Sequence, residues 1–208
     1  WNAHHQGVFT IKERYDFSCA IFGPDGSLVA NAPHVPVHLG SMGASIKTII
    51  RENKGKMKPG DAYVINAPYN GGTHLPDVTV ISPVFNTDGN KIIFYVASRG
   101  HHADIGGRTP GSAPPDSVSI HEEGVLIDNF LMVKDGILQE QDTLDLLASG
   151  EYPCRNPEQN MADLEAQIAA NNTGRHEVMR MINQFGLDVV QAYMVHVQDN
   201  AEEAVRGV

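Results

Sequence analysis

The chain has 208 residues, enough to bury a hydrophobic core without help from disulfide bonds. Hydrophobic residues make up 41% of it and charged residues 19%, which is typical of a globular protein and argues against a disordered one. Fifteen basic and twenty-five acidic residues give a formal net charge of −10, with no visible cluster of Lys and Arg. This charge excludes nucleic acid and anionic membranes from the expected partners.

The cysteines and the apolar runs indicate the compartment. Cys19 and Cys154 lie far apart in sequence and outside any C-x-x-C motif, and no secretory signal accompanies them. The longest apolar runs, such as 91–97, are far shorter than the roughly 20 residues that cross a bilayer. We therefore expect a cytoplasmic protein that does not insert into a membrane.

Asp-Gly turns between apolar segments predict β-hairpins in the first two-thirds of the chain. Strands at 19–22 and 27–30 flank Pro-Asp-Gly, and strands at 78–85 and 91–97 flank Asn-Thr-Asp-Gly-Asn. A third turn is expected at Lys134-Asp135-Gly136. Between the first two hairpins, isoleucines at helical spacing predict a helix over 41–52.

From about residue 156 glycine and proline become rare, and apolar residues recur at three- and four-residue steps. This pattern predicts a long helix or helical pair over 157–185, capped by Asn156, and another helix over about 188–206. The expected fold is α+β, with an antiparallel or mixed sheet of long hairpins followed by a C-terminal helical section. We expect a β-rich region with the site at 1–155 and a helical section at 156–208, packed on the first or used in assembly.

The second hairpin gathers the residues that carry the chemistry. A two-residue turn at Asp88-Gly89 places Asp77 opposite Gly100 and His74 opposite Ala103, so both histidine-bearing runs meet at one end. Two imidazoles and a carboxylate suit Mn²⁺, Fe²⁺ or Zn²⁺ and leave coordination positions open. The predicted metal ligands are His74, Asp77, and His101 or His102.

Adjacent residues of a strand point to opposite faces, so one of the two neighbouring histidines is expected to bind the ion and the other to support it. We assign His101 to the metal, and His102, Asp104 and Glu123 to ligand orientation or proton transfer. The competing interpretation is that these loop histidines only make hydrogen bonds. For His34 and His38, where Pro33 and Pro36 indicate an extended loop, that interpretation is preferred.

Five segments of the chain resemble the hydantoinase B/oxoprolinase family, and they occur in family order. They are 16–20 (Asp-Phe-Ser-Cys-Ala), 34–42 (His-Val-Pro-Val-His-Leu-Gly-Ser-Met), 66–77 (Asn-Ala-Pro-Tyr-Asn-Gly-Gly-Thr-His-Leu-Pro-Asp), 98–107 (Ser-Arg-Gly-His-His-Ala-Asp-Ile-Gly-Gly) and 122–124 (Glu-Glu-Gly).

The resemblance implies an ATP-dependent enzyme that opens a cyclic amide such as a hydantoin or 5-oxoproline. It implies that a hydantoinase A-type subunit or domain uses ATP and Mg²⁺ to activate the substrate, in a hetero-oligomer. It also implies a divalent metal on His74, Asp77 and one of His101 or His102. No phosphate-binding loop motif occurs in this chain, in agreement with ATP binding elsewhere. Family members are much longer, so the resemblance covers the N-terminal portion of such a subunit.

Two alternatives remain open at this stage. One is a subunit of an ATP-dependent ketone carboxylase, because acetone and acetophenone carboxylases share the resemblance. The other is a scaffold without catalytic activity, whose helical section serves assembly.

Overall fold

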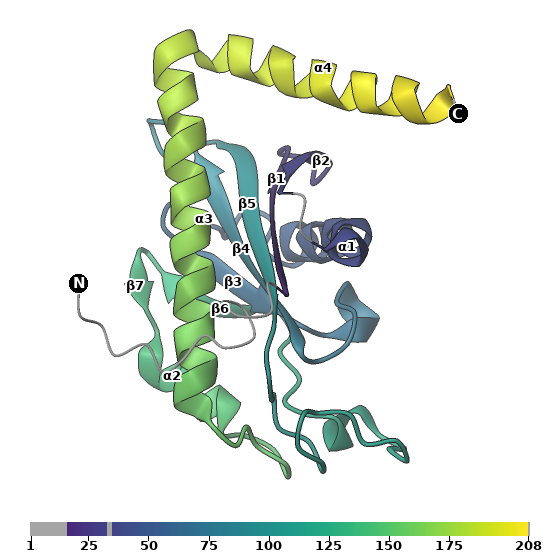
Figure 1. Cartoon of the computed structure of the whole chain (residues 1–208). Helices are drawn as coiled ribbons and strands as arrows, with labels where there is room; N and C mark the ends of the chain where they lie inside the picture. Colours follow the sequence, from purple (N-terminus) through teal and green to yellow (C-terminus); the bar gives the residue numbers. More distant parts are fainter. Residues whose placement is uncertain (1–15, 33–34, 208) are drawn as a thin grey trace, which may run out of the picture.

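A seven-stranded antiparallel sheet lies at the centre of the computed structural model, which describes residues 16–32 and 35–207 (Figure 1). The strands lie in the order β2-β1-β5-β4-β3-β6-β7, so the hairpin β4–β5 occupies the middle. Their bounds are β1 (Phe17–Phe22), β2 (Leu28–Asn31), β3 (Ala62–Ile65), β4 (Asp77–Phe85), β5 (Ile92–His101), β6 (Phe130–Lys134) and β7 (Ile137–Leu138). With its C-terminal helices, this sheet confirms the predicted α+β class.

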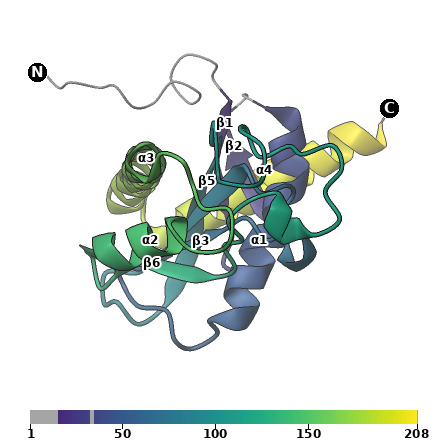
Figure 2. The same cartoon turned by 90° about the horizontal axis from the view of Figure 1, so that it is seen from below.

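Helices cover both faces of the sheet, as Figures 1 and 2 show for α1 (Pro36–Glu52) and α3 (Pro157–Phe185). Alternate residues of a strand point to opposite faces. Tyr95 and Ala97 accordingly pack in the core under α1, whereas Phe94 and Val96 pack in the core under α3. A strand buried on both faces is mostly apolar, and this explains the apolar run 92–97 of β5 and the predominantly apolar sequence of β4.

Helix α1 begins at Pro36, earlier than the predicted start at Ser41. Proline fits the first position of a helix, because its fixed φ is helical and the missing N–H would have no partner there. The prediction of an extended loop is therefore wrong for Pro36 and His38. Pro33 and His34 lie outside the described residues. As a result, His38 belongs to the first turn of α1.

The register of the hairpin β4–β5 differs from the prediction by one residue over most of its length. Phe85 pairs with Ile92 as predicted, but a β-bulge between Val84 and Phe85 shifts every later pair, so Asp77 lies opposite His101 and not Gly100. The turn is also longer than a two-residue one. Asn86 closes it, because the Asn86 side-chain oxygen accepts hydrogen bonds from the backbone N–H groups of Asn90 and Lys91 at 3.1 Å.

The other two predicted turns occur as expected. Pro24-Asp25-Gly26 connects β1 and β2, and Asp135-Gly136 connects β6 and β7. Asp135 has a φ of 51° and Gly136 a φ of 82°, the positive values that a type I′ turn requires at both central residues. Aspartate and glycine adopt these values at the lowest cost, which explains why this pair predicts a hairpin.

The C-terminal part is helical as predicted. Asn156 caps α3, because its side-chain oxygen accepts a hydrogen bond from the backbone N–H of Gln159 at 3.2 Å. After Gly186 the chain turns into α4 (Leu187–Arg206), which crosses the end of β2 (Figure 1). Shorter helices are η2 (Pro68–Asn70), η3 (Ile120–Glu122) and α2 (Glu140–Leu147). The division of the chain at residue 155 stays a prediction.

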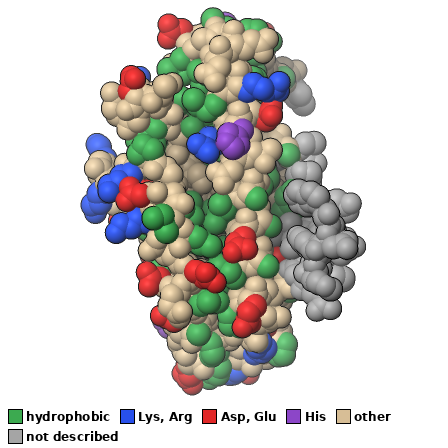
Figure 3. All heavy atoms as spheres, turned by 90° about the vertical axis from the view of Figure 1, so that its left-hand side faces the viewer, with side chains coloured by type: hydrophobic (Ala, Val, Ile, Leu, Met, Phe, Trp, Pro, Cys, Tyr) green, Lys and Arg blue, Asp and Glu red, His purple; other side chains and the backbone are tan. Residues whose placement is uncertain are grey.

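The face shown in Figure 3 carries hydrophobic side chains along its middle, with charged side chains of both signs scattered around them. A hollow of about 600 Å³ lies on the molecule between α3 and the turn end of β4, lined by Ile168, Met179 and Val84 among others. This hollow lies at the opposite end of β4 from Asp77. Within the described part of the chain, no helix is both long and apolar enough to cross a bilayer.

Four polar residues of α3 face the sheet and are almost completely buried: Asn160, Asp163, Gln167 and Asn171. Asp163 is 1% exposed, and among the described residues the Gln159 side chain donates a hydrogen bond to it at 3.2 Å. Burial raises the pKa of the Asp163 carboxyl group from 3.8 to about 6, because a charged carboxylate is poorly solvated there. The ionised form is therefore a cost to folding at neutral pH.

We expect Asp163→Asn to stabilise the fold above pH 6 by up to about 3 kcal/mol, with little effect near pH 4. A raised pKa means that the folded state holds its proton where the unfolded state has lost it. The free energy of unfolding of the unchanged protein therefore falls as pH rises from about 4 to about 6, and the variant lacks this part of the fall. Urea unfolding at a series of pH values measures the difference in the free energy of unfolding between the two proteins. A difference that does not depend on pH would contradict the expected effect of Asp163 ionisation.

Candidate metal centre

Asp77 and His101 face each other at the end of the central hairpin. Asp77 is the first residue of β4 and His101 the last residue of β5, and the bulge places them directly opposite. Side chains of opposite residues lie on the same face of a sheet. Asp77 Oδ1 lies 2.9 Å from His101 Nδ1, at the end of the sheet where α1 begins.

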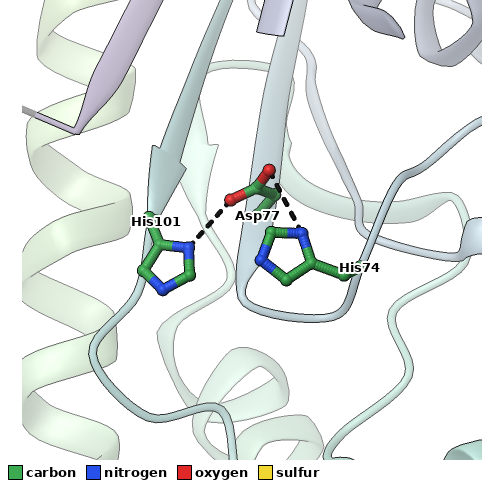
Figure 4. A group of neighbouring side chains, drawn as sticks. All are labelled: His74, Asp77 and His101. Atoms are coloured by element: carbon green, nitrogen blue, oxygen red, sulfur yellow. Dashed lines mark hydrogen bonds and ion pairs between the residues drawn. The ribbon is translucent and has the colours of Figure 1, made fainter. Parts of the chain in front are cut away.

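His74 reaches the same carboxylate from the loop before β4. Its Nδ1 lies 3.2 Å from Asp77 Oδ2, so His74 and His101 contact different oxygens of the Asp77 carboxylate (Figure 4). The loop depends on Gly71, with a φ of 94°, and on Gly72, where a Cβ would lie 2.3 Å from the Asn66 carbonyl oxygen. Since a larger residue does not fit at these positions, the glycine pair lets the chain pass close enough to bring His74 to Asp77.

The donor set of these three residues fits a divalent cation. One ligand atom from each of His74, Asp77 and His101 lies within 4.8 Å of the others, a spacing that small side-chain rotations bring to bond lengths of about 2.0–2.2 Å around a common centre. The Asp77 side chain is 7% exposed, whereas the side chains of His101 and His74 are 30% and 54% exposed. An ion can therefore enter from the histidine side.

His38 is a fourth residue at Asp77, although its sequence context predicted only a loop histidine. Its Nε2 lies 3.4 Å from Asp77 Oδ2 and 3.7 Å from Asp16 Oδ1, while its Nδ1 lies 3.1 Å from Ser18 Oγ. The side chain is 4% exposed, so it supports the carboxylate from inside the protein. Pro36 suits the first position of a helix, and this could have indicated that His38 lies in the first turn of α1.

Burial by itself would raise the pKa of the Asp77 carboxyl group, but hydrogen bonds from His101, His38 and His74 outweigh this effect and hold the pKa well below its usual range. Thr73 adds a further donor, its hydroxyl lying 3.2 Å from Asp77 Oδ2. Asp77 is therefore a carboxylate at neutral pH, and a carboxylate is the form that binds metal.

Arg99 lies completely buried below the site and connects the elements that carry it. Its guanidinium donates to Thr79 Oγ1 at 2.8 Å, to Ser45 Oγ at 2.9 Å and to Ser41 Oγ. Ser45 in turn donates to the carbonyl oxygen of Gly71, which begins the His74 loop. Within 16–32 and 35–207, no carboxylate forms an ion pair with Arg99.

Burial lowers the pKa of Arg99 to about 10, and the charge of Asp77 partly offsets this effect. The guanidinium is therefore still protonated at neutral pH. A fixed positive charge thus lies two residues from His101 on β5, on the face of the sheet that carries Asp77.

The family model described as Hydantoinase B/oxoprolinase matches residues 8–208. The chain belongs to this family. The resemblance seen in the sequence motifs is thereby confirmed.

Curated relatives and a solved structure agree with this membership. The chain is 52% identical to 5-oxoprolinase 1 of Arabidopsis thaliana and to 5-oxoprolinase of Dictyostelium discoideum, with 94% of the chain matched in each case. It spans only 16% and 15% of the length of these two relatives. The structure of the ATP-dependent caprolactamase from Pseudomonas jessenii superimposes with a TM-score of 0.84 at 26% identity, covering 93% of this chain and 32% of that one.

In this hydantoinase B/oxoprolinase chain, His102 lies on the opposite face of the sheet from His101. It is 0% exposed, and both ring nitrogens have hydrogen-bond partners on α3. Burial lowers the pKa of His102 to about 4, so the ring is neutral at pH 7. The predicted role of His102 in proton transfer does not fit this geometry, because neither nitrogen remains for a substrate.

Asp104 also serves the local structure. Its carboxylate accepts hydrogen bonds from the backbone N–H groups of Gly106 and Gly111 at 2.9 and 3.0 Å, and from the Arg155 guanidinium at 2.8 Å. These contacts connect the loop after β5 to the segment before α3. The backbone N–H of Arg155, at 3.4 Å, is a fourth donor to this carboxylate. The catalytic role of Asp104 stays a prediction.

Glu123 is the predicted catalytic residue that the fold places beside His74. Both line a cavity of about 360 Å³, together with Thr73, Tyr69 and Val118 among others. Glu123 Oε1 accepts a hydrogen bond from Ser117 Oγ at 2.9 Å. Tyr69 and Val118 are 95% and 91% exposed, so the cavity is open to solvent on that side.

We expect Arg99→Met to lower the free energy of unfolding by about 2–4 kcal/mol, because it removes three buried charge-assisted hydrogen bonds at once. Arg51→Met is the matched control, since Arg51 lies on α1 with a side chain that is 61% exposed and should change stability by less than about 0.5 kcal/mol. Urea unfolding of both variants measures the difference. Equal effects of the two substitutions would show that the Arg99 contacts contribute little.

Proposed function

We propose that the chain is the metal-bearing part of an ATP-dependent cyclic-amide hydrolase of the 5-oxoprolinase type. Family membership and the 5-oxoprolinase relatives at 52% identity support this proposal, as does the likeness to a structure whose printed name is ATP-dependent caprolactamase. Both names denote enzymes that act on a lactam, which is a cyclic amide. Because the chain spans a small part of these relatives, the proposal concerns the longer protein to which such a chain contributes.

The observation that carries the proposal is the Asp77 carboxylate between two imidazoles, open to solvent on the His74 side. We propose that His74, Asp77 and His101 hold a Mn²⁺, Zn²⁺ or Fe²⁺ ion. A bound divalent cation supplies a Lewis acid that polarises a carbonyl group and lowers the pKa of a water molecule.

The residues around the centre have separate roles in this proposal. His38 and Thr73 hold the Asp77 carboxylate in position from the protein side. The cavity beside His74 receives the substrate, and Glu123 at its wall accepts or returns a proton during hydrolysis of the amide. Tyr69 and Val118 offer apolar contacts to the carbon atoms of the ring.

ATP is used by another part of the enzyme in this proposal. The described residues contain no Gly-rich phosphate loop, and the predicted partner is a hydantoinase A-type subunit or domain that binds ATP and Mg²⁺ and activates the substrate. The two parts would form a hetero-oligomer or be joined in one long chain. The free thiols of Cys19 and Cys154 are compatible with a cytoplasmic location.

Metal binding is the first test. We expect the unchanged chain to bind Mn²⁺ or Zn²⁺ with one ion per chain, and His74→Ala or His101→Ala to weaken the affinity by more than about 100-fold, since loss of a ligand costs more than loss of its supporting residues. His121→Ala is the control, because His121 is exposed and outside the centre. Isothermal titration calorimetry measures the affinities. Absence of stoichiometric metal would favour the scaffold without catalytic activity.

Substrate choice is the second test. We expect the full-length enzyme with its ATP-binding partner to hydrolyse 5-oxoproline or a hydantoin with consumption of ATP, and Glu123→Gln to lower kcat by at least about 100-fold, the contribution of a general base. A panel of lactams, hydantoins and ketones, scored by ATP consumption, measures both. Turnover of ketones with bicarbonate but not of lactams would replace this proposal by the ketone carboxylase.

A further inference from the structure

Two amide side chains of α3 hold the ring of His102 at both nitrogens. Asn160 Nδ2 donates to His102 Nδ1 at 3.0 Å, and His102 Nε2 lies 3.2 Å from Gln167 Oε1. The side-chain nitrogen of Gln167 donates to the carbonyl oxygens of Val78 and Ser98. The atom of this amide that faces His102 is therefore the oxygen. His102 therefore carries its proton on Nε2 and is neutral.

The same residues fix the backbone on both sides of Asp77. The backbone N–H of His102 donates to the carbonyl oxygen of Pro76 at 2.9 Å, and Gln167 Nε2 donates to the carbonyl oxygen of Val78 at 2.9 Å. Pro76 and Val78 are the two neighbours of Asp77. The strand that begins with Asp77 is thus tied to α3 through His102 and Gln167.

The contacts also fix the end of β5. His101 is the last residue of the strand, and its neighbour His102 points to the opposite face. A strand end has few ladder hydrogen bonds and frays unless other groups hold it. With the His102 ring bonded at both nitrogens, the backbone of His101 has a fixed direction toward Asp77.

We propose that His102, Asn160 and Gln167 are positioning residues for the metal centre on the opposite face of the sheet. The inference rests on the proposed metal site of His74, Asp77 and His101. Buried amides cost free energy unless their polar atoms are bonded, and only an interface that is apolar on both sides avoids this requirement. The amide contacts of Asn160 and Gln167 therefore stabilise one specific position of the two strand ends, where Asp77 and His101 must lie within bonding distance of one ion.

Asn171 provides a matched control on the same helix and the same face. It is 3% exposed, against 2% for Asn160, and its amide nitrogen donates to the carbonyl oxygen of Val80 at 3.1 Å and to Ser82 Oγ at 3.3 Å. It makes no hydrogen bond with His102. Asn160→Leu and Asn171→Leu therefore remove equivalent buried amides, but only the first releases the His102 ring.

The experiment compares Co²⁺ binding, followed by the visible absorption of the bound ion, with thermal unfolding of the same proteins. We expect both variants to lower the melting temperature to a similar extent, and only Asn160→Leu to weaken Co²⁺ binding, by about tenfold or more, with a changed absorption spectrum. Gln167→Met is the second variant, expected to act like Asn160→Leu, and it carries the test where Asn160→Leu does not fold.

The outcomes separate this inference from the proposed function. The positioning role would be overturned, and the metal site left intact, by one result. This result is that Asn160→Leu and Gln167→Met show the same Co²⁺ affinity and spectrum as Asn171→Leu and the unchanged protein. Failure of the unchanged protein to bind Co²⁺, Mn²⁺ or Zn²⁺ would overturn the proposed metal site itself, and with it the positioning role.

Discussion

A carboxylate buried at the end of a hairpin must find hydrogen-bond donors on every side, and Asp77 finds them in three imidazoles from three different elements. His38 comes from α1, His74 from the loop before β4, and His101 from β5. Each contact requires its own element to be in place. The negative charge of Asp77 therefore makes the fold and the proposed metal site depend on the same arrangement.

Polar side chains support this arrangement from both faces of the central hairpin. On the α1 face, Arg99 joins β4, β5, α1 and the His74 loop through serine and threonine hydroxyls. On the α3 face, Gln167 and Asn160 reach His102 and the backbone carbonyl oxygens beside Asp77. The apolar core holds the layers together, whereas these polar contacts determine where the two strands end relative to each other.

Local patterns in the sequence were sufficient for the hairpins, the long helix α3 with its Asn156 cap, and the grouping of His74, Asp77 and His101. They were insufficient for the exact register of the central hairpin, the start of α1 and the burial of one face of α3. The bulge beside Phe85 arises from a turn closed by the Asn86 side chain, and the early start of α1 depends on Pro36. The buried polar residues of α3, at three- and four-residue steps, resemble an exposed face until the sheet behind them is known.

The bulge between Val84 and Phe85 gives the central hairpin two regions with different tolerance of insertions and deletions. A residue added in the turn only enlarges a loop that is already irregular. A residue added or removed within one strand, between the bulge and the strand ends, exchanges the two faces. Removal of one residue from β5 turns His102 toward Asp77, so an imidazole still reaches the carboxylate, but α3 loses the ring that its amides hold. An added residue in β5 places Gly100 opposite Asp77 instead, and no imidazole comes from the strand. Length variation in related chains is therefore expected in the turn and excluded from the strands.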